Sequence, residues 1–209
     1  MEYERLLKIL RTISDLNENN IIERVKEELE KEDPDTYKKW QDNGFNINYT
    51  FDDQSTLLHI AARNDLVKIA ELLIKKGGNV NTADQDGWNP LHFAVASGSI
   101  GVVEILIANG VNVNVADQNG CTPLHCATIN GHEEIVELLL EKRANVDVAD
   151  EYGRTSLCWA IRNGYSEIAR ILLENKADPL LGHKSFNTLK LLIELIKNDF
   201  KHSKSMSSN

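Results

Sequence analysis

The strongest constraint on the fold is a set of residue columns that recur every 33 positions. His59, His92 and His125 are 33 residues apart, and Cys158 takes the next place in the same register. The other columns in register are Leu58, Leu91, Leu124 and Leu157, and Ala61, Ala94, Ala127 and Ala160. Columns that hold over four copies without an insertion predict tandem copies of one structural unit.

Each copy has the local pattern of a short helix pair. In the third copy, Pro123 stands where a helix begins, because its missing N–H costs nothing in the first turn. Gly131 interrupts the apolar stretch that follows, and residues 133–142 place aliphatic side chains on one helical face. Neither helix reaches the roughly 12 to 15 residues that an isolated helix needs. Each copy must therefore bury its apolar face against the next.

Two six-residue segments give the pattern a name. Residues 89–94 read Asn-Pro-Leu-His-Phe-Ala and residues 122–127 read Thr-Pro-Leu-His-Cys-Ala, which resembles the signature of ankyrin repeats. The resemblance implies an all-α ankyrin-repeat solenoid of stacked helix-turn-helix units joined by hairpin-like loops. We expect four full repeats, at 51–83, 84–116, 117–149 and 150–182.

The flanking segments are predicted to close the two ends of the stack. Residues 1–50 are interpreted as an N-terminal cap with a degenerate repeat, and helices are expected at 2–12, 21–31 and 35–42. Asn20 and Glu23 resemble a capping box, and Pro34 fits the start of a helix.

At the other end, residues 183–209 are interpreted as a C-terminal capping helix followed by a disordered tail. This segment carries a charge of +3, against −12 for the rest of the chain. A basic amphipathic helix that binds a membrane or a partner groove is the open alternative.

Three residues depart from the glycine expected at two loop positions. Asp65 replaces the glycine between the two helices of its repeat, and Arg143 and Lys176 replace the glycine that ends the second helix. We predict a left-handed backbone at these positions, which costs about 1 kcal/mol for a residue with a side chain.

The composition excludes several functional classes. A net charge of −9 and a pI near 5.2 argue against a protein that neutralises nucleic-acid phosphates or adsorbs to anionic membranes. Three cysteines and an acidic start without a signal-peptide pattern favour a cytoplasmic protein. An effector that a microbe secretes into a host cell is the alternative.

The sequence predicts no catalytic site, and neither a cofactor nor a metal is expected. Successive helix pairs are separated by about a helix diameter, roughly 10 Å, so the periodic histidines cannot share one ion. The resemblance implies instead that each histidine hydrogen-bonds loop backbone. Cys121, Cys126 and Cys158 lack zinc spacing, and Glu133–Glu134 fits a solvated helix face. An enzyme hidden in residues 1–50 is disfavoured, because that segment has no His or Cys.

The resemblance implies that a partner protein is bound by the loop tips and by the exposed ends of the first helices. The residues carried over are Asp53, Arg63, Gln85, Asp86, Trp88, Gln118, Asn119, Asn130, Glu151, Tyr152, Arg154 and Arg162. Trp88 and Tyr152 are expected to be exposed, as binding anchors often are. Phe93, Trp159 and Trp40 are expected to serve packing.

The predicted function is therefore a non-catalytic protein–protein interaction module. We expect a monomer whose acidic charge favours a protein partner of basic character, without nucleic acid or membrane. An inhibitory protein that occludes a partner's functional site would have the same sequence features. Asn81 and Asn114 also match positions that can be hydroxylated in family members.

Overall fold

A computed structural model describes residues 2–182 of the chain. Within this range there are eleven α-helices and no β-strand. The chain divides between Gln118 and Asn119 into two compact units, called here the first unit and the second unit. Each unit is described by itself.

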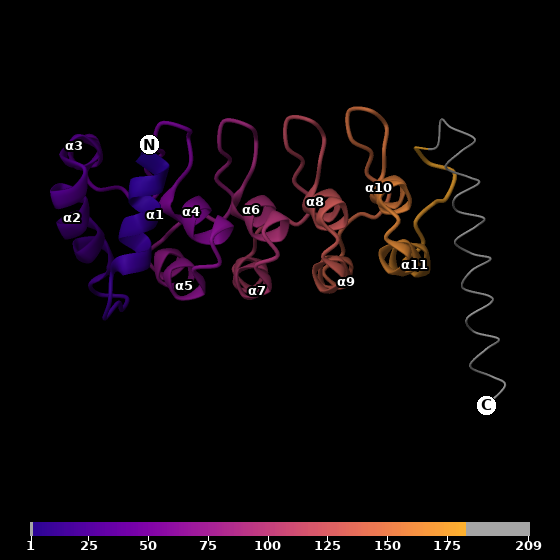
Figure 1. Ribbon diagram of the computed structural model, residues 1–209, viewed down its shortest axis with the longest axis horizontal. Helices are drawn as coiled ribbons and strands as arrows, with labels where there is room; N and C mark the ends of the chain where they lie inside the picture. Colours follow the sequence, from indigo (N-terminus) through magenta and orange to yellow (C-terminus); the bar gives the residue numbers. More distant parts are fainter. Residues whose placement is uncertain (1, 183–209) are drawn as a thin grey trace. The chain divides into compact units, whose positions relative to one another are not determined.

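Three helices precede the periodic part of the first unit, at α1 (Glu2–Thr12), α2 (Ile21–Glu32) and α3 (Pro34–Asp42). They match the predicted helices, and Trp40 is fully buried as expected. Helix α1 packs against both α2 and α4, which begins the periodic part (Figure 1). The first helix of the chain therefore lies beside α4.

The predicted capping box at α2 is wrong. Asn20 occupies the N-cap position, but its side chain makes no cap hydrogen bond to the helix. Its Oδ1 accepts the Asn17 N–H at 2.8 Å and its Nδ2 donates to the Asp15 carbonyl at 2.9 Å, so the amide closes the preceding loop. The next helix is capped by Asp33, whose carboxylate accepts the Thr36 N–H.

The periodic part of the first unit consists of two helix pairs. They are α4 (Leu57–Arg63) with α5 (Val67–Lys75), and α6 (Pro90–Ala96) with α7 (Ile100–Ala108). Helix α4 packs on α6 and α5 packs on α7, and the loop between α5 and α6 extends away from the second helices (Figure 1). The apolar columns of the sequence are therefore the faces buried between successive pairs.

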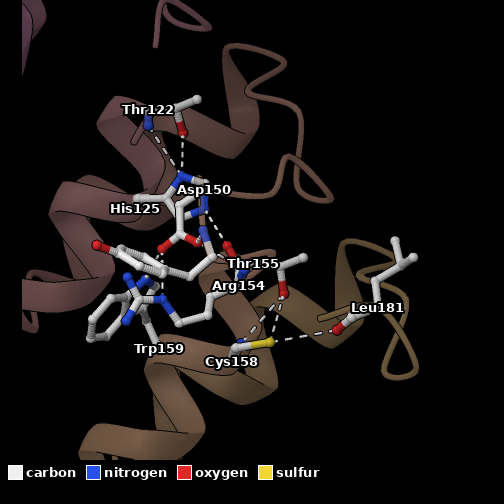
Figure 2. Close-up of polar contacts among 9 residues, drawn as sticks. Thr122, His125, Asp150, Arg154, Thr155, Cys158, Trp159 and Leu181 are labelled. Atoms are coloured by element: carbon white, nitrogen blue, oxygen red, sulfur yellow. Dashed lines mark hydrogen bonds and ion pairs between the residues drawn. The ribbon is translucent and has the colours of Figure 1, made fainter. Parts of the chain in front are cut away.

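The second unit contains the same arrangement in α8 (Pro123–Asn130), α9 (Glu133–Glu141), α10 (Ser156–Asn163) and α11 (Ser166–Glu174). His125 Nδ1 accepts the Thr122 N–H at 3.1 Å, and its Nε2 lies 3.1 Å from the Arg154 carbonyl oxygen (Figure 2). In the next pair Cys158 takes this place, with its Sγ 3.5 Å from the Leu181 carbonyl oxygen. The periodic residue thus joins its helix to the loop that follows, as the resemblance implied.

The predicted left-handed positions are confirmed. Asp65, Arg143 and Lys176 have φ values of 53°, 65° and 69°. The glycines that other repeats carry at these places have similar positive φ, for example 78° at Gly110 and 75° at Gly131. The backbone turn is therefore kept where the glycine is not.

Candidate functional site

Most of the residues expected to bind a partner lie on loop tips, and within each unit neighbouring tips are joined by a backbone hydrogen bond. In the first unit, the Gln85 N–H donates to the Asp53 carbonyl at 3.4 Å, and the Gln118 N–H donates to the Asp86 carbonyl at 3.1 Å. In the second unit, the Glu151 N–H donates to the Asn119 carbonyl at 2.8 Å. Neighbouring tips within a unit are therefore fixed relative to each other.

A cleft in the first unit brings three of the predicted residues together. Arg63, Asp86 and Trp88 line a hollow of about 460 Å³, which we call the Trp88 cleft. Its other lining residues are Asp84, Phe93, Ala96 and Ser97. The loop contributes acidic and aromatic side chains, and helices α4 and α6 contribute the rest.

Trp88 is half-buried, so its expected free exposure is wrong. Its Nε1 donates to the Asp117 carboxylate at 2.9 Å, and its ring centroid lies 5.0 Å from that of Phe93 and 5.7 Å from that of His92. These contacts hold the indole in one orientation while part of it lines the cleft. A fixed aromatic ring loses little conformational entropy on binding.

The charged groups of the Trp88 cleft form only some of the hydrogen bonds that they can make. Asp84 Oδ1 accepts the N–H groups of Asp86 and Trp88, at 2.9 and 2.8 Å. Within residues 2–182, the other Asp84 oxygen and the Asp86 carboxylate form no hydrogen bond or ion pair. The Arg63 guanidinium lies over the Tyr3 and Phe93 rings, at 5.3 and 5.7 Å from their centroids. The three ionised groups sum to one negative charge.

The remaining predicted residues of the first unit differ in how available they are. Asp53 is half-buried, and its Oδ1 accepts hydrogen bonds from the backbone N–H and the hydroxyl of Ser55. Gln85 and Gln118 are exposed, and Gln118 Nε2 donates to the Gln85 carbonyl at 2.6 Å. None of these three side chains lines the Trp88 cleft.

In the second unit, Tyr152 is 65% exposed, which confirms its predicted exposure. Beside it, the Arg154 guanidinium lies 4.4 Å from the Tyr152 ring centroid and 4.2 Å from that of Trp159. Arg162 is exposed at the end of α10, with its guanidinium 5.3 Å from the Trp159 centroid. Glu151 is exposed next to Tyr152, and its hydrogen bond with the tyrosine hydroxyl raises the pKa of Tyr152.

Two further predicted residues of the second unit, Asn119 and Asn130, are also exposed. Asn130 Nδ2 donates to the Cys126 carbonyl within its own helix, at 2.8 Å. The cysteine of the loop column, Cys121, is half-buried, and Cys126 and Cys158 are buried. Glu133 and Glu134 are exposed on α9, as predicted for a solvated face.

The sequence reasoning missed three residues that contribute to these surfaces. Asp84 and Phe93 line the Trp88 cleft, and Trp159 lies against Arg154 and Arg162 in the second unit. Phe93 and Trp159 share a repeat column that had been assigned to packing, and both are half-buried. The available signal was an aromatic residue at the same position of the first helix in two repeats.

The described residues contain no group of three or more His, Cys, Asp or Glu side chains arranged to hold a metal ion. Each of His59 and His125 is bonded within its own unit, to its helix start and to the following loop. No helix in the described part of the chain has the length and apolar character needed to span a bilayer.

Comparison with known proteins agrees with the geometry. The family model for ankyrin repeats, described as three copies, matches residues 27–117 and residues 101–183. No curated protein matches the chain significantly. The family match extends over more than half of the chain, and the described helices are paired and stacked as such repeats require. Ankyrin repeats are an interaction fold that binds proteins and is typically non-catalytic. The chain therefore belongs to the ankyrin repeat family.

Proposed function

We propose that this protein is a non-catalytic interaction module whose Trp88 cleft receives a basic side chain of a partner protein. The observation that carries this proposal is the convergence of Arg63, Asp86 and Trp88 on one cleft. The loop contributes two carboxylates to the lining, and the aromatic residues supply apolar surface.

A lysine or arginine side chain fits the charge and the surface of the cleft. The Asp86 carboxylate and the second oxygen of Asp84 accept hydrogen bonds from a cation, and charge-assisted bonds of this kind are the stronger ones. The Trp88 and Phe93 rings contact the aliphatic stem and attract the cationic head. The net charge of the lining, −1, is matched by one basic side chain.

Arg63 sets a limit on the length of basic sequence that the cleft accepts. Its guanidinium has no ion pair within the described residues and lies over two aromatic rings. It repels a second cation and donates hydrogen bonds to a backbone carbonyl or an acidic side chain of the partner. The partner segment is therefore a single basic residue flanked by acceptor groups, rather than a polybasic run.

The test is a selection of peptides from a random display library on the immobilised full-length protein. We expect the selected peptides to be enriched in Lys or Arg at one position. A selected peptide should bind Asp86→Asn about tenfold more weakly than wild type, which corresponds to 1.4 kcal/mol, and its binding should weaken with salt.

Asp35→Asn is the matched control, because Asp35 is exposed on α3 and does not line the cleft. Trp88→Ala should also weaken binding, provided that circular dichroism shows it folded. Selected peptides without a preferred basic position would refute the proposal. Equal binding by Asp86→Asn, Asp35→Asn and wild type would refute it as well.

A further inference from the structure

The second unit holds an arrangement of side chains with the opposite sign of charge. Asp150 is buried in the loop before α10 and accepts four hydrogen bonds (Figure 2). Its Oδ1 accepts the N–H groups of Tyr152 and Arg154, both at 2.9 Å. Its Oδ2 accepts Arg154 Nε at 2.8 Å and Trp159 Nε1 at 3.3 Å. Asp150 is therefore fully occupied in positioning these three residues.

Arg154 is held between two aromatic rings by this contact. Its guanidinium lies 4.4 Å from the Tyr152 centroid and 4.2 Å from the Trp159 centroid, and its side chain is 28% exposed. A guanidinium stacked on aromatic faces keeps its planar donors available at the edges. Because the side chain is already ordered, a ligand that binds it does not meet the usual entropy cost of fixing an arginine.

Donor groups remain unused on both arginines near Trp159. Within the described residues, Arg154 Nη1 and Nη2 donate no hydrogen bond, and the Arg162 guanidinium forms neither a hydrogen bond nor an ion pair. Both guanidinium groups lie within 5.3 Å of the Trp159 ring centroid. We call this arrangement the arginine pair.

We propose that the arginine pair binds the carboxylate of an acidic side chain, Asp or Glu, from a partner protein. A guanidinium presents planar donors that match the two oxygens of a carboxylate, and the arginine pair places two such groups against one indole ring. The exposed face of Tyr152 gives the flanking residues of the partner an apolar contact. The site rests on the proposed interaction function but lies in the other compact unit and takes a ligand of opposite charge.

The local charge favours a carboxylate over a doubly charged phosphate. Asp150 neutralises one of the two arginines, which leaves one positive charge for the ligand. The other nearby acid, Glu151, interacts with the Tyr152 hydroxyl, so its charge lies at the loop tip and repels a dianion about twice as strongly as a single carboxylate. A single carboxylate thus matches the remaining charge more closely than a phosphate does.

The test uses the immobilised full-length protein and four random peptide libraries with a fixed central residue, which is Glu, Gln, phosphoserine or Lys. Peptides from the Glu library should be retained at least about tenfold better by wild type than by Arg162→Gln, because charge-assisted hydrogen bonds are lost. Lys142→Gln is the matched control, because Lys142 is exposed in the same unit and has no ion pair within the described residues. Arg162→Lys should recover only part of the binding, since a lysine lacks the planar fork.

Arg162 is the informative position because it forms no hydrogen bond or ion pair with Asp150, whereas removal of Arg154 would leave that buried carboxylate without its ion pair. Equal retention of Glu and Gln peptides, or equal loss in Arg162→Gln and Lys142→Gln, would overturn the proposal. Stronger retention of phosphoserine peptides would replace it with phosphopeptide binding. If Lys or Arg peptides still bind through Asp86, this inference fails alone and the proposed function stands.

Discussion

His59 Nε2 lies 3.1 Å from the carbonyl oxygen of Trp88, a residue of the next loop in the first unit. On the other side of the ring, Nδ1 accepts the Thr56 N–H at 3.0 Å. Since Nδ1 accepts, the proton is on Nε2 and the neutral imidazole donates to Trp88. One buried ring thus joins the start of α4 to the loop that carries the Trp88 cleft, and His125 joins α8 to Arg154 in the same way.

The buried neutral state of His59 predicts a loss of stability in mild acid. Burial lowers the pKa of His59 below 6.5, against smaller raising effects of the Trp88 carbonyl and Asp84. The unfolded chain then binds a proton more readily than the folded one. The contribution of His59 to the free energy of unfolding is therefore fully present above about pH 6.5 and is lost as the pH drops below it. Up to about 1.4 kcal/mol per pH unit is expected from this group, measured by urea unfolding at several pH values.

Carboxylates with lowered pKa, such as Asp33 and Asp150, affect stability only in more acidic solution, below their usual value of 3.8. A change in the free energy of unfolding just below pH 6.5 therefore reports the protonation of histidine. The control is an NMR titration of the His59 ring in the folded protein. A pKa at or above 6.5 would contradict the assignment of a buried neutral ring.

Alanine substitutions at two glycines with almost the same backbone conformation distinguish the cost of a steric clash between loops from the cost of a left-handed backbone. Gly120 and Gly153 have φ values of 77° and 76°. A Cβ at Gly120 would lie 3.1 Å from the Glu151 backbone nitrogen, whereas a Cβ at Gly153 would meet nothing within 4 Å. We expect Gly153→Ala to cost about 1 kcal/mol and Gly120→Ala to cost about 1 to 3 kcal/mol more. Chemical unfolding of both variants measures the difference, and equal costs would mean that these loop tips are not packed together.

Glycine should stabilise the two helix ends where a longer side chain has positive φ. Arg143→Gly and Lys176→Gly remove left-handed strain of about 1 kcal/mol each, which raises the midpoint of thermal unfolding by about 2 to 4 °C. Lys142→Gly is the matched control, because Lys142 has φ of −87° and should be destabilised by glycine. Unchanged or lower midpoints for Arg143→Gly and Lys176→Gly would show that their side chains compensate the strain.

Trp40 should be a principal stabilising residue of the N-terminal helices. It is fully buried, its ring packs edge-on against Phe45 at 5.3 Å, and its Nε1 donates to the Asn46 carbonyl at 2.8 Å. Trp40→Ala is expected to cost about 3 to 5 kcal/mol, and Trp40→Phe less, because most of the ring volume remains. Urea unfolding measures both. A small effect of Trp40→Ala would show that α3 contributes little to the stability of the first unit.

Local features of the sequence were sufficient to place the helices. Pro34, Pro90 and Pro123 each stand at the first helical residue, and the interruptions at Gly98 and Gly131 separate the paired helices. These signals work because the helix start and the left-handed turn depend on the backbone of a few adjacent residues. The capping box at Asn20 failed for a related reason, since its amide found nearer partners in the preceding loop.

The sequence could identify most residues of the candidate surfaces, but it could not predict how exposed each side chain is or which contacts it makes. Trp88 and Tyr152 were both expected to be exposed, yet the indole of Trp88 is held by Asp117, which lies 29 positions away in the chain. The column that had been assigned to packing supplied Phe93 and Trp159. The exposure of Trp88 depends on a contact with the next loop. The roles of Phe93 and Trp159 depend on the loop residues that pack beside them.

The sequence by itself determined the repeating helix pair, its turns and its family, because a 33-residue register of apolar and turn residues leaves one way to bury each short helix. The tertiary structure alone decided that α1 packs beside α4, that Asp86 and Trp88 share a cleft with Arg63, and that two arginines lie against the Trp159 ring. These arrangements arise from contacts between residues distant in the chain, whose distances and unused hydrogen-bonding groups are set only when the repeats pack.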